Sequence, residues 1–375
     1  MQIFNYIPEV ISNFQCSAEA NNVQPYGSGH INDSFLVKNV TLEGSDYLLQ
    51  RINNSIFTDV EALTRNMLLV TQHLKNKVLT QHGDPFKEVM TLIPTNSDQY
   101  YYLDSGGNYW RMLYFLKDTR SYDMVSTEKQ AYEGGKAFGR FQSMLADFPS
   151  EELFEVIPDF HNIEFRLSQL KEAIASNLAD RLETVTEELD LVKAYANAMR
   201  YFQQPETCST LPKRVTHNDT KFNNVLLSQY DEAQCVIDLE TVMQGYVAYD
   251  FGDAIRTIIN TAAEDEAELG KIQLNIALFR AYTRGYLENA ANFLTNKEIE
   301  SLVKGVLLFP YMQGVRFLTD HLNGDTYYKI KFENHNLQRT RAQFQLFKKL
   351  HEKETEIQQI IQKEISNLKT SQAHG

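Results

Sequence analysis

Residues 215–227, 235–242 and 249–256 read Val-Thr-His-Asn-Asp-Thr-Lys-Phe-Asn-Asn-Val-Leu-Leu, Cys-Val-Ile-Asp-Leu-Glu-Thr-Val and Tyr-Asp-Phe-Gly-Asp-Ala-Ile-Arg. Asp219 precedes Asn224 by five positions, and Asp238 follows Asn224 by fourteen. Runs of β-branched and apolar residues at 213–216 and 224–227 predict two short strands joined by a loop with Asp219 at its tip. The apolar start of the second block predicts a strand that returns Asp238 to the side of Asp219 and Asn224.

This ordered set matches the chemistry of phosphoryl transfer. Such a reaction needs a carboxylate that receives the acceptor's hydroxyl proton, an oxygen ligand for magnesium, and a second carboxylate that bridges metal and phosphates. Asp219, Asn224 and Asp238 fit these roles in that order. Glu240 lies two positions after Asp238, on the same side of an extended strand, and two carboxylates this close repel each other unless a cation lies between them. We therefore expect Glu240 to be a further metal ligand or to position Asp238.

The three blocks resemble the aminoglycoside phosphotransferases, choline kinases and their sugar-kinase relatives, a branch of the protein-kinase-like fold. They are most similar to the N-acetylhexosamine 1-kinases, and weaker blocks extend the resemblance over most of the chain. The resemblance implies an α+β, bilobal architecture. A small N-terminal lobe with an antiparallel sheet would span residues 1–116, and a larger, mainly helical lobe would span residues 117–375. It also implies ATP as donor, Mg²⁺ as cofactor, and an N-acetylhexosamine as acceptor.

Composition agrees with a soluble globular protein and excludes some partners. The chain has 375 residues, 43% of them hydrophobic, and a formal net charge of −13, which argues against binding nucleic acid or an anionic membrane. Three dispersed cysteines form neither a disulfide framework nor a zinc-site spacing. Without a secretory leader pattern or a long apolar run, we expect a cytoplasmic monomer that contacts only ATP and a sugar.

The predicted N-terminal lobe contains candidate nucleotide-binding residues. Gly27, Ser28 and Gly29 lie between strand-like segments, where glycines let main-chain N–H groups approach phosphates. Next to them, His30 is a candidate sugar contact. The hinge that reads the adenine edge would lie at Tyr114 to Leu116, a placement that rests on position in the fold.

A departure from the kinase pattern occurs in the predicted third strand, residues 47–52, which has no lysine for the phosphates. Arg51 and Gln50 lie on opposite faces of this strand. If Arg51 points inward, its guanidinium can neutralise phosphate with fixed geometry. If Gln50 points inward, neutralisation falls more heavily on magnesium. We favour Arg51.

The C-terminal lobe carries further candidates. Arg316 and Asp320 are one helical turn apart, which is typical of a surface ion pair, whereas the resemblance gives both, with Tyr327, a role in the acceptor pocket. The polar segment 260–266 is a second candidate lining for that pocket.

Asp250 and Asp253 are expected to be structural, with a buried Asp fixing the catalytic loop. Gly135 and Gly139, four residues apart in a predicted helix, favour close helix packing.

Two other function classes compete with the kinase hypothesis. A nucleotide-binding protein without transferase activity would explain the missing lysine, but not the presence of Asp219, Asn224 and Asp238 together. A metal-dependent hydrolase that uses His217 and Asp219 lacks the additional ligands that such a site needs. Among kinases, choline, homoserine, methylthioribose and aminoglycosides remain alternative acceptors.

Overall fold

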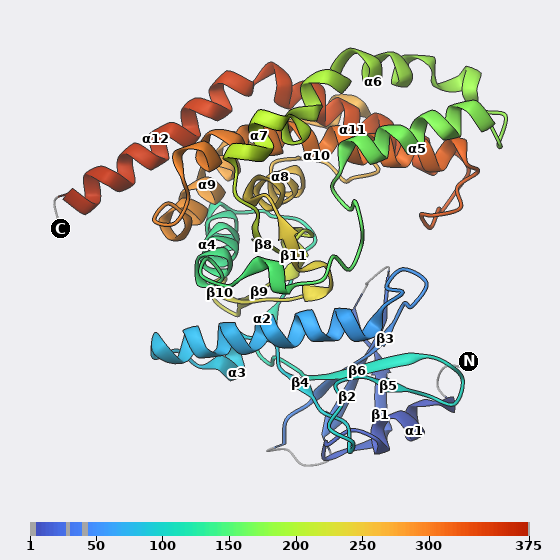
Figure 1. The fold of residues 1–375 in the computed structure, drawn as a ribbon, viewed down its shortest axis with the longest axis vertical. Helices are drawn as coiled ribbons and strands as arrows, with labels where there is room; N and C mark the ends of the chain where they lie inside the picture. Colours follow the sequence, from blue (N-terminus) through green and yellow to red (C-terminus); the bar gives the residue numbers. More distant parts are fainter. Residues whose placement is uncertain (1–4, 28–30, 40–43, 374–375) are drawn as a thin grey trace.

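The computed structural model describes residues 5–27, 31–39 and 44–373 of the chain (Figure 1). A sheet-containing lobe occupies one end of the molecule and a larger, mainly helical lobe occupies the other, with α2 between them. The predicted α+β, bilobal fold is therefore confirmed. None of the helices in the described ranges is long and apolar enough to cross a membrane.

The N-terminal lobe is built on an antiparallel sheet. In the described part of the lobe the strand order is β1-β2-β3-β6-β4, with β5 also paired to β6. The strands are β1 (Ala18–Pro25), β2 (Asp33–Asn39), β3 (Tyr47–Ile52), β4 (Leu92–Ile93), β5 (Tyr102–Leu103) and β6 (Tyr109–Tyr114). The long register between β3 and β6 pairs Gln50 with Arg111 and Arg51 with Trp110.

Helices cover both faces of this sheet because successive side chains of a strand point to opposite sides. Leu49 packs in one cluster with Ile7 and Val10 of α1 (Ile7–Ser12). Leu48 packs in another with Val70 of α2 (Val60–Thr80). A short α3 (Pro85–Glu88) follows α2. The sheet is thus held between a small helix and the helix that faces the other lobe.

The C-terminal lobe is mainly helical. Its helices are α4 (Glu128–Met144), α5 (Ile163–Ser176), α6 (Thr186–Met199), α7 (Pro205–Thr210), α8 (Val247–Ile258), α9 (Ile276–Ala290), α10 (Asn296–Leu322), α11 (His335–Glu352) and α12 (Glu354–Ala373). The predicted close helix packing at Gly135 and Gly139 is confirmed. A Cβ on Gly135 would lie 2.1 Å from the carbonyl oxygen of Tyr282 in α9, and one on Gly139 would lie 2.4 Å from that of Tyr286.

Short strands connect the lobes and hold the catalytic segment. β7 (Thr119–Arg120), just after the hinge, pairs with β9 (Val225–Ser228), which pairs with β10 (Ala233–Val236). Separately, β8 (Arg214–Thr216) pairs with β11 (Met243–Gly245). The two predicted strands around the Asp219 loop therefore exist, but they belong to two different ladders. The Asp219 loop therefore connects the β8–β11 ladder to the β7–β9–β10 sheet.

Candidate active site

The loop between β8 and β9 is held in place by hydrogen bonds to a buried carboxylate. Asp250, 1% exposed, accepts the main-chain N–H of His217 at 2.8 Å through Oδ2 and that of Asn218 at 2.7 Å through Oδ1. Gln142 donates to the same carboxylate at 2.7 Å. Burial raises the pKa of Asp250 to about 7, against the lowering effect of these hydrogen bonds. The expected structural role of Asp250 is confirmed, and Asn218 is held at a positive φ of 63°.

Asp219 lies at the loop tip and carries a negative charge at neutral pH. Its side chain is 20% exposed, and its Oδ1 lies 3.0 Å from Lys221 Nζ. Asn224 Nδ2 donates to its Oδ2 at 3.2 Å and to its main-chain oxygen at 2.8 Å. Burial works to raise the pKa of Asp219, but the charge and hydrogen bond of Lys221 leave it below the ordinary value. An ionised, partly accessible carboxylate of this kind can accept a proton from a bound hydroxyl.

Asp238 is brought next to Asn224 by the chain that follows β10. The Ile237 N–H donates to the Asn224 carbonyl at 2.9 Å, and the Ile237 carbonyl lies 2.8 Å from Nε2 of His217. Asp238 itself adopts the left-handed conformation, φ 62° and ψ 54°. Burial, followed by the charges of Glu240 and Asp219, raises its pKa to about 7. A nearby cation would stabilise the charged form of this carboxylate.

The donor chemistry of Asn224 and Asp238 fits a magnesium ion. Magnesium takes carboxylate and amide oxygens and completes its octahedron with water and substrate phosphates. Asn224 donates through Nδ2, which leaves its Oδ1 for a metal, and Asp238 accepts no hydrogen bond from any described residue. No group of three His, Cys, Asp or Glu side chains in the described ranges forms a metal cluster. An ion here would therefore depend on ATP for further ligands.

Glu240 has a protein partner that sequence reasoning missed. Its carboxylate forms an ion pair with Arg111 of β6, and both side chains are buried, at 4% and 2% exposure. Asn32, at the start of the N-terminal sheet, also donates to Glu240. The structure therefore places a guanidinium against this acid, and its role as a metal ligand stays a prediction. An arginine inside the apolar run of residues 109–116 was the available signal, because a buried cation requires a partner.

Arg51 and Gln50 lie on opposite faces of β3, as expected. Arg51 pairs with Asp33 and donates to Asn108 Oδ1 at 3.2 Å. Gln50 Oε1 accepts from Arg111 at 2.9 Å and 2.7 Å. It is therefore Gln50 that faces the cation at the lobe interface, while Arg51 is held within the N-terminal lobe. Its contact with phosphate stays a prediction.

The nucleotide side of the site is partly described. Gly27 has a positive φ of 78°, and Tyr26 packs edge-on against Phe115 of the hinge at 5.2 Å between ring centroids. Ser28, Gly29 and His30 lie outside the described residues. At the hinge, the Tyr114 N–H donates to Thr91, whereas the Leu116 N–H makes no hydrogen bond to the described part of the chain. The predicted contact of residues 114–116 with adenine stays a prediction.

The predicted acceptor residues of α10 do not form an ion pair with each other. Asp320 is buried and accepts main-chain N–H groups of Thr326, Tyr327 and Tyr328 at 2.8–2.9 Å, so it shapes the loop after α10. Arg316 instead stacks over the rings of Phe160 and Tyr328. Tyr327 is 62% exposed. Arg316 and Tyr327 are thus accessible to a ligand, while Asp320 is committed to the loop.

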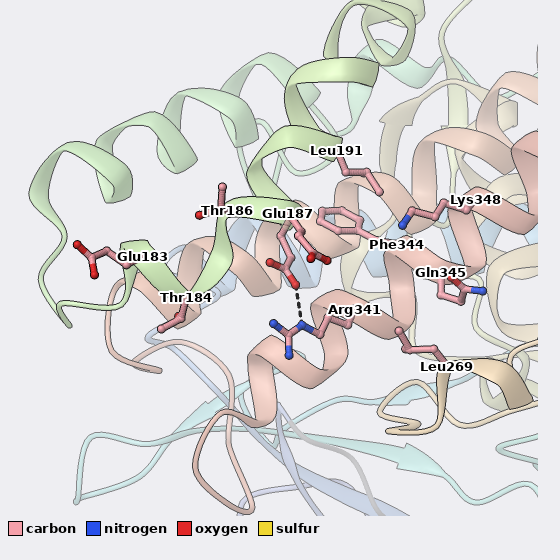
Figure 2. A pocket seen from close by; sticks show the side chains of 11 residues that line it. Glu183, Thr184, Thr186, Glu187, Leu191, Leu269, Arg341, Phe344, Gln345 and Lys348 are labelled. Carbon is pink, nitrogen blue, oxygen red and sulfur yellow. Dashed lines mark hydrogen bonds and ion pairs between the residues drawn. The ribbon is translucent and has the colours of Figure 1, made fainter.

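A sizeable cavity lies away from the catalytic candidates. Its volume is about 590 Å³, and its lining comes from the start of α6 and one face of α11, including the ion pair between Glu188 and Arg341 at 2.6 Å (Figure 2). It contains none of the catalytic candidates. A smaller cavity of about 160 Å³ borders Lys221 and is lined in part by Asn260 and Glu264, within the polar segment predicted to reach the acceptor.

Comparisons with known proteins agree with this geometry. A family model described as "Phosphotransferase enzyme family" matches residues 22–289. An aminoglycoside phosphotransferase from Alicyclobacillus acidocaldarius has 14% sequence identity and a TM-score of 0.57, covering 98% of this chain and 96% of that one. Choline kinase from Cryptosporidium parvum Iowa II has 16% identity and a TM-score of 0.57, covering 94% and 96%. Amicoumacin kinase hAmiN, in complex with AMP-PNP and Ca²⁺, has 12% identity and a TM-score of 0.57, covering 89% and 91%. At these identities the solved structures establish the fold alone.

Proposed function

Because this chain belongs to the phosphotransferase enzyme family and is a small-molecule kinase of that family, we propose that it phosphorylates the anomeric hydroxyl of an N-acetylhexosamine. ATP would be the donor and the sugar 1-phosphate the product. The observation that carries a kinase function is the ionised Asp219 at the tip of a clamped loop, with Asn224 and Asp238 beside it. The choice of sugar is supported by the resemblance of the sequence blocks.

Asp219 would act as the proton acceptor. The acceptor hydroxyl would donate to its carboxylate, while Lys221 keeps that carboxylate ionised and Asn224 fixes its orientation. The anomeric hydroxyl is the most acidic hydroxyl of a free sugar, so one carboxylate suffices as base. Asp250 contributes by holding the loop so that Asp219 does not need to be positioned during the reaction.

Asn224 and Asp238 would hold Mg²⁺ against the donor phosphates. When bound there, the ion supplies neutralisation of charge on the phosphate oxygens. The Leu116 main chain would orient the adenine, and the Gly27–Gly29 segment would cover the phosphates.

The charge on the acceptor side weighs against cationic acceptors. Arg316 and Arg166 stand together near Phe160, and Arg316 covers the faces of Phe160 and Tyr328 with its own guanidinium. Choline recognition requires free aromatic faces around the ammonium group. A polycationic aminoglycoside would likewise be repelled. A neutral or acidic sugar meets no such repulsion.

A panel assay tests the proposal. ADP release would be followed with N-acetylglucosamine, N-acetylgalactosamine, glucose, galactose, choline, homoserine and an aminoglycoside. We expect the two acetamido sugars to be turned over best, since a pocket that bonds the acetamido group rejects analogues without it. Phosphorus-coupled proton NMR would locate the phosphate on the anomeric carbon. Phosphate on the 6-hydroxyl, or faster turnover of choline, would refute the sugar 1-kinase assignment and leave the family membership intact.

A further inference from the structure

Two arginines from different helices meet on the acceptor side of the site. Arg166 lies in the first turn of α5, and Arg316 lies in the last third of α10. Both contact Phe160: Arg166 Nη2 donates to its carbonyl at 2.8 Å, and the Arg316 guanidinium lies 5.5 Å from its ring centroid. Burial, and then the nearby charge of Arg316, lowers the pKa of Arg166 to about 10. Two positive charges are therefore held close together in a partly buried position.

Neither arginine has an acidic partner within the described residues. Arg166 donates from Nη1 to the amide oxygen of Gln169 at 2.9 Å, and its buried Nε has no partner there. Arg316 donates to the amide oxygen of Gln313 at 3.2 Å. Amide and carbonyl oxygens satisfy the geometry of a guanidinium but do not neutralise it. Among the described residues, no salt bridge offsets the repulsion between the pair.

The surroundings of the pair contribute charge of both signs. Arg166 stands at the N-terminal end of α5, where the helix dipole is itself positive. Asp159 attracts Arg166 from a distance, but its Oδ1 accepts from Asn162 at 2.7 Å instead of from the arginine. The neighbouring His161 is neutral because burial lowers its pKa to about 3. Two arginines without a salt bridge thus lie together in a protein whose formal charge is −13.

The arginine pair is linked to the catalytic loop through one residue. His161 stacks on Phe160 with ring centroids 4.4 Å apart, and its Nε2 lies 2.9 Å from the carbonyl oxygen of Asn218. Asn218 directly precedes Asp219. Residues 160 and 161 thus link the arginines to the residue that precedes Asp219, and His161 lies near the charges of all three side chains. An acceptor whose hydroxyl lies on Asp219 would have to span these two residues to reach the pair.

We propose that Arg166 and Arg316 form an anion-binding subsite for a carboxylate or phosphate group of the acceptor. The inference rests on the proposed function and sharpens it: the preferred acceptor is an N-acetylhexosamine that carries an acidic substituent away from its anomeric carbon. Guanidinium groups bind such anions through paired, charge-assisted hydrogen bonds. One anion bound between the arginines would neutralise the repulsion between them.

A binding experiment tests the subsite without any sugar. Thermal unfolding of the full chain would be followed in sodium sulfate and in sodium chloride of equal ionic strength. Arg166→Gln and Arg316→Gln would be compared with Arg284→Gln, which removes another arginine stacked on an aromatic ring, Tyr132. General salting-out by sulfate raises Tm in every variant. We expect an additional rise in the parent protein and Arg284→Gln that is lost in the other two. An equal sulfate effect in all four proteins would overturn the subsite.

A kinetic experiment identifies the group that is bound. The matched acceptors are N-acetylglucosamine, its 6-carboxylate (the uronic acid) and its 6-phosphate. We expect kcat/KM for one of the acids to exceed that for the neutral sugar by about tenfold or more, the scale of a charge-assisted hydrogen bond. Arg166→Gln should reduce this ratio, and Arg284→Gln should not. Turnover of all three sugars without an acid preference would overturn the subsite and keep the proposed function. Loss of the sulfate effect in Arg166→Gln, with no hexosamine turned over, would support the subsite and refute the sugar assignment.

Discussion

Arg111 of β6 and Glu240, two residues beyond Asp238, form a buried ion pair that joins the N-terminal sheet to the catalytic segment. Gln50 accepts two further hydrogen bonds from the same guanidinium, and Asn32 donates to the same carboxylate. The pair therefore ties three parts of the N-terminal lobe to the segment that carries the candidate magnesium ligand. Its polar atoms are satisfied on both sides.

Arg111→Met should destabilise the protein strongly, because it leaves Glu240 as an unpaired buried charge. Removing one partner of a buried pair typically costs about 3–5 kcal/mol. Arg51→Met is the matched control, since its pair with Asp33 is partly exposed and exposed pairs contribute about 0–1 kcal/mol. Urea unfolding would give both values. A similar decrease in the free energy of unfolding of the two variants would show that the Arg111 pair contributes no more to stability than the Arg51 pair.

Asp219→Asn should bind ATP as the parent protein does and lose most turnover, because shape is kept while the proton acceptor is removed. Loss of a general base typically lowers the rate by about 100- to 10,000-fold. Steady-state ADP release together with calorimetric ATP binding would separate the two effects. Activity above about a tenth of the parent value would exclude Asp219 from this role.

Asp238→Ala should abolish the gain in ATP affinity that magnesium provides, with little effect on folding. The carboxylate accepts no hydrogen bond from the described residues, so its removal leaves no protein group unpaired. Titrations of ATP with and without magnesium, performed on parent and variant, supply the comparison. If the variant still gains affinity from magnesium, the ion is held without Asp238.

Gly135→Ala should destabilise the packing of α4 on α9. The added Cβ would lie 2.1 Å from the main-chain oxygen of Tyr282, so one of the helices must move. Overpacking of this kind costs about 1–3 kcal/mol. Gly270→Ala is the control, because no atom lies within 4 Å of its added Cβ. Thermal and urea unfolding of both variants would measure the difference, and equal stabilities would contradict the packing argument.

His161 should make the protein less stable as the pH falls below about 6.5. Burial lowers its pKa in the folded state to about 3, so between these values only the unfolded chain binds the proton. Linkage then requires the free energy of unfolding to decrease with falling pH, by about 1.4 kcal/mol per pH unit at most. His161→Gln should lose this contribution. Urea unfolding of parent and variant at pH 5 to 7 would show it, and parallel pH profiles would rule it out.

The fold and the catalytic segment could be predicted from sequence because their signals are local. The strand runs on both sides of Asp219 and the spacing to Asn224 and Asp238 depend on short stretches of chain. Gly135 and Gly139 likewise predict a close helix contact, because glycines four residues apart lie on one face of a helix. The separation of the two strands into different ladders was not visible, because pairing depends on β7 and β11, which lie far away in the sequence.

Partners of charged residues were the least predictable part of the site. The spacing of Arg316 and Asp320 favours an ion pair, but Asp320 is used by three main-chain N–H groups of the following loop. Arg111 lies in a run of aromatic and apolar residues, and nothing in that run indicates that its partner is Glu240. Both pairings escaped prediction for one physical reason. A long charged side chain can reach several groups, and only the tertiary structure determines which of them lie nearby.

The pairing of β7 with β9 has a mechanical consequence. Thr119 lies three residues beyond Leu116, and its partner Ser228 lies four residues beyond Asn224. The segment that follows Leu116 and the strand that follows Asn224 are therefore joined in one short antiparallel ladder. An adenine bound at Leu116 and a metal ion held by Asn224 would therefore keep a fixed separation, set by this ladder.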